Sequence, residues 1–260
     1  IGRATAELIA ANGASVLIND LDADAAEQAA AEIDGETAVY AGDMTKAEAA
    51  DELVATANEA FGSVDIVVNN AGYTWDGVAH KRSDEQFQAM LDIHTIVPFR
   101  VARALAPHWR EAAKAEAAEG REVFRKLINV SSISGTMGNA GQVNYSAGKA
   151  AVVGMTKTLA KEWGQFKINV NAVAFGFVET RLTAAKDEEA ETVKAPDGSD
   201  IQLGIPEPMR AMASMIIPLG RPASPEEASG PVLFLASNLA DYVHGQVVNV
   251  TGGQFGGMYT

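Results

Sequence analysis

The sequence contains no cysteine. This absence excludes a disulfide framework, a thiolate metal site and a cysteine nucleophile, and it agrees with a reducing cytoplasm, which is the location we expect. Cationic residues are few, because 20 Lys and Arg stand against 34 Asp and Glu and leave a net charge of −14. Nucleic-acid binding needs clustered cations, so we expect no nucleic-acid partner.

Long apolar runs are also missing. No apolar run reaches the ~18 residues of a membrane span, and no basic stretch followed by an apolar one marks a signal peptide. We therefore expect no membrane association. His80, His108 and His244 lack the spacing of metal ligands, so we expect no metal site. With 260 residues and 47% hydrophobic content, the sequence suits one α/β domain over residues 1–260.

Short β-branched runs alternate with alanine-rich segments of helical spacing. The apolar runs are nearly continuous, as in strands that are buried on both faces. The expected strands are residues 15–19, 37–41, 64–69, 126–131, 167–173 and 246–250. The expected helices are residues 3–11, 23–33, 46–61, 84–118, 146–166 and 225–236. This alternation predicts an α/β fold with a doubly wound parallel sheet of the Rossmann type.

Two regions depart from the alternation. Residues 182–218 are rich in Glu, Pro, Gly and Met and show no clear strand, and long loops of this kind are usually functional, so we expect a substrate lid there. The chain opens directly into a helix at Arg3, whereas such a sheet should begin with a strand and a glycine turn. We therefore expect the N-terminal strand to be absent from the sequence given.

Polar residues or glycine follow one expected strand after another. They are Asn19-Asp20, Asp43, Asn69 to Gly72, and Ser131-Ser132. Each alone could be a turn or a helix cap, since Asp, Asn and Ser serve both purposes. Doubly wound sheets bind ligands beyond the carboxyl ends of their strands. Together these residues predict one shared cleft at that edge.

Tyr145 and Lys149 are spaced as i and i+4, which places them on one face of a helix. A neighbouring ammonium group favours the phenolate and lowers the pKa of a tyrosine. Taken alone this spacing is a weak signal, and it is more often a surface helix pair. Ser132, at an expected strand end upstream, favours a catalytic role.

Taken together, these residues give the chain a resemblance to the short-chain dehydrogenase/reductase family, and the resemblance extends from Ile1 to about Gly253. The matching elements are Asn69-Asn70-Ala71-Gly72, Ser132, Tyr145-x-x-x-Lys149, and Asn171 to Gly176 leading to Glu179-Thr180. Within the family, residues 135–145 are similar to those of 3-oxoacyl-acyl-carrier-protein reductases. The resemblance implies an NAD(P)-dependent oxidoreductase that moves hydride between a nicotinamide cofactor and a carbonyl or secondary alcohol.

The resemblance also implies the catalytic roles. Tyr145 would be the general acid or base, Lys149 would lower its pKa and bind the nicotinamide ribose, and Ser132 would hold the substrate oxygen. Ser131 and Ser134 are competing serines, and the family's spacing to the tyrosine selects Ser132. His94 stands where the family often has a proton-relay asparagine, and it is either a relay residue or a packed core histidine.

The cofactor site implied by the resemblance spans several strand ends. Its residues are Gly2, Asp20, Asp43, Met44, Asn70, Ala71, Gly72, Tyr145, Lys149, Gly176, Val178 and Thr180. The Asp20 carboxylate would accept bonds from the adenosine ribose and repel a 2′-phosphate. We therefore expect NAD(H) to be preferred, with NADP(H) possible. The alternative is that Asp20 caps the helix beginning near Ala23.

The substrate expected from the resemblance is a 3-oxoacyl thioester on acyl carrier protein or coenzyme A. The alternatives are an NAD-dependent steroid, sugar or other alcohol dehydrogenase, and a catalytically silent nucleotide-binding protein. The presence of Ser132, Tyr145 and Lys149 argues against a silent protein. The absence of the glycine turn, which in the family binds the cofactor phosphates, argues for one. By resemblance we also expect a homotetramer, built from the helices at 84–118 and 146–166 and the C-terminal edge.

Overall fold

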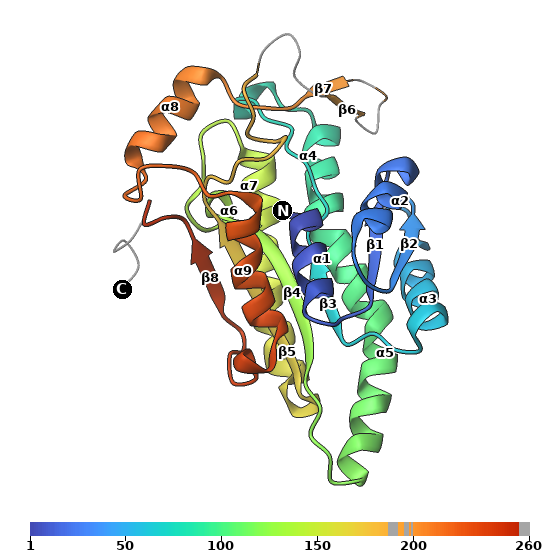
Figure 1. Cartoon of the computed structure of the whole chain (residues 1–260). Coiled ribbons are helices and arrows are strands. Elements are labelled where there is room, and N and C mark those ends of the chain that lie inside the picture. The colour runs from blue at the N-terminus through green and yellow to red at the C-terminus, as the bar shows by residue number, and fades with distance from the viewer. Residues whose placement is uncertain (187–191, 195–197, 199, 255–260) are drawn as a thin grey trace.

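The central sheet of the computed structural model has four parallel strands in the order β3-β4-β5-β8 (Figure 1). The structure describes residues 1–186, 192–194, 198 and 200–254. The four strands are β3 (Ile66–Asn69), β4 (Arg125–Ser132), β5 (Ile168–Phe175) and β8 (Val247–Val250). A second parallel pair is formed by β1 (Val16–Asp20) and β2 (Thr37–Ala41). The predicted α/β class and its parallel strands are confirmed.

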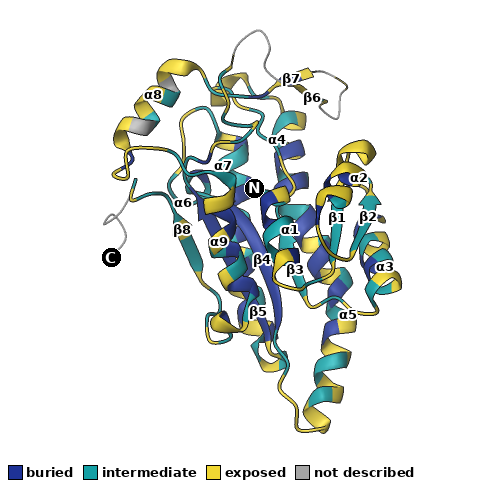
Figure 2. Cartoon of the chain, in the orientation of Figure 1, coloured by how far each residue is buried: buried dark blue, intermediate teal, exposed yellow. Residues whose placement is uncertain are grey.

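The two longest strands lie in the middle of the sheet, where both faces are covered. Every residue of β5 is buried, as are all residues of β4 except its last, Ser132 (Figure 2). Polar side chains inside these strands are paired. Asn129 accepts a hydrogen bond from Asn69 at 2.8 Å and donates one to Thr156 Oγ1 at 2.9 Å. The paired register places Ser132 opposite Phe175, at the carboxyl edge of the sheet.

Helices cover the two faces of the sheet and bury separate apolar clusters. One cluster joins α3 (Ala49–Phe61), α5 (Val97–Ala118) and α7 (Val143–Trp163) to the strands. The other lies under α9 (Pro225–Ala236), which packs against α1 (Gly2–Ala11). The remaining helices are α2 (Ala23–Glu32), α4 (Asp84–Leu91), α6 (Ile133–Met137), α8 (Glu207–Ile216) and short 3-10 turns at Ala79–Lys81, Gly164–Phe166 and Asn238–Ala240. None of the helices in the described ranges is long and apolar enough to cross a membrane.

The six predicted strands form two parallel sheets rather than one. Within the described part of the chain, β1 and β2 pair only with each other, and no strand joins β1 to β3. The chain enters α1 at Gly2.

The helix predicted over residues 84–118 is divided in the structure. Between α4 and α5 lies one π-helical segment, Asp92–Ile96, in which the N–H of Val97 donates to the carbonyl of Asp92. Such i→i+5 turns contain one residue more than an α-helical turn and are frequent at functional sites. Continuous helical spacing in the sequence did not reveal this extra residue.

The prediction that residues 182–218 contain no strand is wrong. A short antiparallel pair, β6 (Thr192–Lys194) and β7 (Asp200–Gln202), and the helix α8 lie in this region. The four terminal residues of these strands are exposed and polar, so no apolar run marked them. Residues 187–191, 195–197 and 199 of the predicted lid lie outside the described residues.

Candidate active site

Ser132 ends β4 and begins α6, where its Oγ accepts a hydrogen bond from Ser134 N at 3.1 Å. The competing serines have other partners. Ser131 Oγ donates to the carbonyl of Lys149 at 2.9 Å, and Ser134 Oγ donates to Gln142 Oε1 at 2.8 Å. Ser132 is instead hydrogen-bonded to the Tyr145 side chain. The structure thus brings together the serine and the tyrosine that the family spacing selects.

Asn144 fixes the position of Tyr145 in the first turn of α7. Its buried side chain accepts a hydrogen bond from Tyr145 N at 2.9 Å and donates to the carbonyls of Trp75 at 3.1 Å and Gln86 at 3.3 Å. The loop after β3 and the helix α4 are thereby joined to the catalytic helix. Sequence analysis gave Asn144 no role, although it stands directly before the tyrosine.

Lys149 lies one turn after Tyr145 on the same face of α7. Its Nζ is 5.7 Å from the centroid of the tyrosine ring and donates a hydrogen bond to the carbonyl of Val130 at 2.7 Å. Burial lowers the pKa of Lys149 to about 7. The predicted shared face is therefore present, and the ammonium group lies behind the ring, against β4.

The phenol of Tyr145 is harder to ionise than a free tyrosine. Burial raises its pKa to about 12, the hydrogen bond from Ser132 acts in the opposite direction, and the carboxylate of Asp76 raises it further. Burial is the largest of these effects, so the net shift of the pKa is upward, and the expected lowering by Lys149 stays a prediction. Tyr145 is consequently a protonated phenol at neutral pH, as a proton donor must be.

His94 lies in the π-helical segment and is buried against Tyr145. The two rings meet edge to face with centroids 5.0 Å apart, and His94 Nε2 is 2.7 Å from the carbonyl of Tyr73. Because a carbonyl only accepts, we assign the proton to Nε2 and a lone pair to Nδ1. Burial, and then the charge of Lys149, hold the pKa of His94 well below its ordinary value. Nδ1 has no hydrogen-bond partner among the described residues.

The His94 ring leaves no room for a side chain at residue 72, so glycine is needed there. A Cβ at residue 72 would lie 2.3 Å from His94 Cε1 and 2.8 Å from Nδ1. We expect Gly72→Ala to displace the ring and to lower the free energy of unfolding by about 1–3 kcal/mol, as overpacking commonly does. Thermal or urea unfolding measures the loss. Gly154→Ala is the control, because nothing lies within 4 Å of its Cβ position in α7, and it should be neutral or stabilising. Equal stability of the two variants would contradict this account of Gly72.

Asp20 is the last residue of β1 and is exposed. Its Oδ1 accepts a hydrogen bond from Asp22 N at 3.1 Å. The cap of α2 is Asp22, whose side chain accepts from Asp24 N and Ala25 N. The alternative that Asp20 caps this helix is therefore wrong, and its carboxylate stands at the strand end.

The next strand ends also carry the predicted residues. Asp43 follows β2, and its Oδ1 accepts from Thr45 N at 2.9 Å and Thr45 Oγ1 at 2.7 Å. Met44 is buried in the apolar cluster, so its side chain packs inward. Gly2 and Asn70 are brought together, since a Cβ on Gly2 would lie 2.4 Å from Asn70 Nδ2. Ala71 follows Asn70 and is exposed.

The residues after β5 are held by local contacts. A Cβ on Gly176 would lie 3.0 Å from Thr251 Cα, so only glycine fits without a shift. Val178 is 3% exposed and belongs to the core under α9, and its carbonyl accepts a hydrogen bond from Thr183 Oγ1. Thr180 N donates to Thr183 Oγ1 at 2.9 Å in a compact turn.

Comparison with known proteins agrees with this geometry. A family model described as enoyl-(acyl carrier protein) reductase matches residues 1–254. The chain is 35% identical over 256 residues to the 3-oxoacyl-[acyl-carrier-protein] reductase of Thermotoga maritima, covering 97% of this chain and 92% of that protein. It is 36% identical to the corresponding reductase of Synechocystis, covering 97% and 92%. The chain belongs to the short-chain dehydrogenase/reductase family. It is an NAD(P)-dependent oxidoreductase acting on CH–OH or carbonyl groups.

The strand ends of this short-chain dehydrogenase/reductase fit a nicotinamide dinucleotide. Asp20 offers an exposed carboxylate, and the Lys149 ammonium bears donors beyond the one bonded to Val130. Parallel strands direct such groups to one edge. The residues present therefore suit the cofactor that the family uses.

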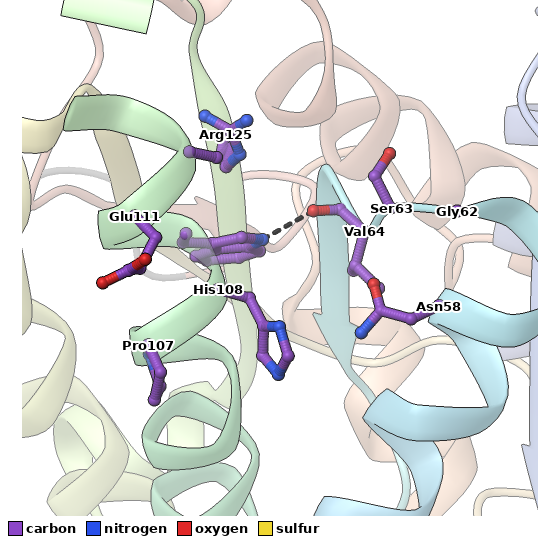
Figure 3. A pocket seen from close by; sticks show the side chains of 10 residues that line it. Asn58, Gly62, Ser63, Val64, Pro107, His108, Glu111 and Arg125 are labelled. Atoms are coloured by element: carbon purple, nitrogen blue, oxygen red, sulfur yellow. Dashed lines mark hydrogen bonds between the residues drawn. The ribbon is translucent and has the colours of Figure 1, made fainter. Parts of the chain in front are cut away.

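A shallow surface pocket of about 490 Å³ lies at the opposite edge of the sheet (Figure 3). It is lined by Val64, which precedes β3, by Arg125, which begins β4, and by His108 and Glu111 of α5. Trp109 also lines it, and its Nε1 donates to the carbonyl of Val64 at 2.6 Å. Because Ser132 stands at the other end of β4, this pocket is separate from the active site. No cluster of metal-ligating side chains occurs among the described residues.

Proposed function

We propose that this protein reduces the keto group of a 3-oxoacyl thioester carried by acyl carrier protein or coenzyme A. The observation that carries the proposal is a protonated Tyr145 hydrogen-bonded to Ser132, with Lys149 on the same helix face. This arrangement suits donation of a proton to a carbonyl oxygen. The relatives from Thermotoga maritima and Vibrio harveyi, at 35% and 34% identity, carry the name of this activity.

The side chains divide the work of the reduction among them. A bound nicotinamide cofactor supplies the hydride to the carbonyl carbon. Ser132 donates a hydrogen bond to the carbonyl oxygen where negative charge develops, and Tyr145 transfers its hydroxyl proton to that oxygen. Lys149 would bind the ribose hydroxyls of the cofactor. These roles remain part of our proposal.

His94 completes the proposal as the residue that serves proton return. Its Nδ1 lone pair is buried and without a partner in the described structure, and the charge of Lys149 acts on the ring. A neutral imidazole with a lone pair can hold a water molecule by accepting a hydrogen bond. We infer that such a water passes a proton toward Lys149 and then Tyr145.

A substrate panel tests the proposed activity. We expect 3-oxoacyl thioesters to give the highest kcat/KM, above 2-enoyl thioesters, steroids, sugars and simple alcohols. A steroid or sugar alcohol as the best substrate would favour an NAD-dependent alcohol dehydrogenase. Cofactor binding without turnover of any compound would favour a catalytically silent nucleotide-binding protein.

The exposed carboxylate of Asp20 supports a preference for NADH over NADPH. It would repel a 2′-phosphate and accept bonds from the ribose hydroxyls. We expect Asp20→Ala to narrow the preference, mainly through the KM for the cofactor. Asp22→Ala is the control, because it removes the helix cap and keeps the strand-end carboxylate, so stability should fall while selectivity stays. A wild-type protein with higher kcat/KM for NADPH would overturn this assignment.

We also propose a homotetramer. Large apolar side chains are exposed on α5 at Phe99 and near the C-terminal edge at Phe234, Leu239 and Tyr242. Burial of these side chains in subunit contacts would remove apolar surface from water. Light scattering coupled to size-exclusion chromatography measures the assembly directly.

A further inference from the structure

Arg100, in the first turn of α5, reaches the loop that follows β2. Its Nη1 donates a hydrogen bond to the carbonyl of Thr45 at 2.7 Å, and the bond is partly buried. A charged donor makes a stronger hydrogen bond than a neutral one, and partial burial shields the bond from water. Sequence analysis gave neither residue a role. The bond ties α5 to a turn at the carboxyl edge of the sheet.

This turn, residues 42–46, lies beside the strand end that carries Asp20. The strands β1 and β2 pair in register with Asp20 opposite Ala41, and Gly42 N donates to the carbonyl of Asp20 at 3.0 Å. Doubly wound sheets bind their ligands at this edge. The turn and the Asp20 carboxylate are therefore neighbours at the edge where a dinucleotide would lie.

Within the turn, Asp43 and Thr45 are bonded to each other. Asp43 Oδ1 accepts hydrogen bonds from Thr45 N at 2.9 Å and from Thr45 Oγ1 at 2.7 Å. Met44, between them, is buried in the apolar cluster that also contains Val101 of α5. Because Arg100 is bonded to the carbonyl of the same Thr45, it restrains the residue that orients the Asp43 carboxylate.

We propose that Arg100 is a positioning residue for the adenosine half of the cofactor, which it serves by fixing the turn that carries Asp43. Both of the described bonds to the Asp43 side chain fall on Oδ1, so Oδ2 can accept a hydrogen bond from a donor such as the exocyclic amine of adenine. The inference rests on the proposed function, in that this function needs a nicotinamide dinucleotide. Arg100 acts through Thr45 and Asp43, not on the reacting atoms.

The expected consequence is a change in cofactor affinity with little change in the chemical step. A turn that is already fixed in the free protein loses less conformational freedom when a ligand binds, so the restraint favours binding. The turn follows β2, in the two-stranded parallel sheet, whereas Ser132 ends β4 and Tyr145 lies on α7. Loss of the Arg100 bond should therefore act on the adenosine end and leave proton transfer at Tyr145 unchanged.

Calorimetric titration with ADP-ribose, which contains the adenosine half and lacks the nicotinamide, tests the proposal without turnover. We expect Arg100→Met to raise the Kd for ADP-ribose about 5-fold, the factor that corresponds to the ~1 kcal/mol of one hydrogen bond. The KM for NADH should rise by a similar factor, while kcat and the KM for the carbonyl substrate stay unchanged. Arg100→Lys keeps a charge and a donor, so it should recover part of the affinity. Arg110→Met, exposed on the same helix over the Phe166 ring, is the control and should leave every value unchanged.

Asp43→Ala shows whether Arg100 acts through the turn. If it does, adding Arg100→Met to Asp43→Ala should weaken ADP-ribose binding much less than Arg100→Met does alone, because both changes remove the same interaction with the ligand. Losses that multiply in the double variant would contradict the action through Asp43.

An unchanged Kd for ADP-ribose in a folded Arg100→Met would overturn the proposal, and so would a fall in kcat larger than the rise in the KM for NADH. If Arg100→Met fails to fold, Arg100→Gln is read in the same way, since its amide is shorter than the guanidinium side chain. Failure of both variants to fold would mean that Arg100 serves stability, and would reject the proposal. A best substrate other than a 3-oxoacyl thioester would reject the proposed function, whereas the ADP-ribose titration would still decide the role of Arg100.

Discussion

Replacing Tyr145 with phenylalanine should lower kcat by ~10²–10⁴-fold, the usual contribution of general acid catalysis, while cofactor affinity stays nearly unchanged. In the proposed mechanism the hydroxyl acts on the reacting oxygen, and the ring that packs edge to face with His94 is retained in the variant. Steady-state kinetics and fluorescence titration of the bound dinucleotide measure the two quantities separately. A large loss of kcat with little change in cofactor affinity identifies a proton donor, whereas a residue that only contacts the cofactor would change the affinity.

The matched control for this variant is Tyr242→Phe. Tyr242 is fully exposed after α9, and no effect on turnover is expected there. Retention of more than a tenth of wild-type kcat in Tyr145→Phe would mean that another group supplies the proton. The buried histidine and the serine beside the tyrosine would then be the residues to examine.

Lys149→Met should change the free energy of unfolding and the affinity for NADH through different effects. The buried ammonium opposes folding, since the pKa of Lys149 falls to about 7 from the ordinary 10.5. Removing the charge should relieve a penalty on the order of a few kcal/mol at low pH. The methionine also leaves the carbonyl of Val130 without its side-chain donor, which costs about 1–3 kcal/mol at every pH. The same variant should bind NADH more weakly, because the donors to the ribose are lost.

The test is to measure the free energy of unfolding of the wild type and of Lys149→Met as a function of pH. Between about pH 7 and pH 10.5 the unfolded chain binds the lysine proton more tightly than the folded protein, so wild-type stability gains from this residue as pH rises. The difference in unfolding free energy between Lys149→Met and wild type should therefore favour the variant most below pH 7 and shrink toward pH 10.5. Lys157→Met, exposed on the same helix, should show no such trend. A pH-independent difference for Lys149→Met would show that the folded protein holds this lysine with an ordinary pKa.

The strands of the central sheet could be predicted because each contains an apolar run that is visible in the sequence. The apolar runs of β4 and β5 are continuous, as burial on both faces requires, and the predicted 126–131 and 167–173 lie within the observed Arg125–Ser132 and nearly within Ile168–Phe175. The shared face of Tyr145 and Lys149 followed from helical spacing, whereas Ser132 was selected from neighbouring serines through the family resemblance. Helical periodicity is enough to place two side chains on one face, and the structure brings them together.

Other features depend on neighbours that lie far away in the sequence. The pKa of Tyr145 is raised mainly by burial, and burial cannot be read from the residues around the tyrosine in the sequence. The pair β6 and β7 is too short and too exposed to carry a hydrophobic signal. Hydrogen-bond partners and burial are properties of the assembled fold.

The wide turn at Asp92–Ile96 also affects how related sequences should be compared. An α-helix advances about 100° per residue, so loss of one residue here would restore an even helix and rotate the preceding turns relative to α5. The composition would hardly change, yet the imidazole of His94 would leave the tyrosine ring. The glycine at residue 72, which leaves room for that ring, would then be free to acquire a side chain. Insertions and deletions in this segment should therefore be read together with the residue at position 72, since a single-residue gap and a lost glycine would record one and the same event.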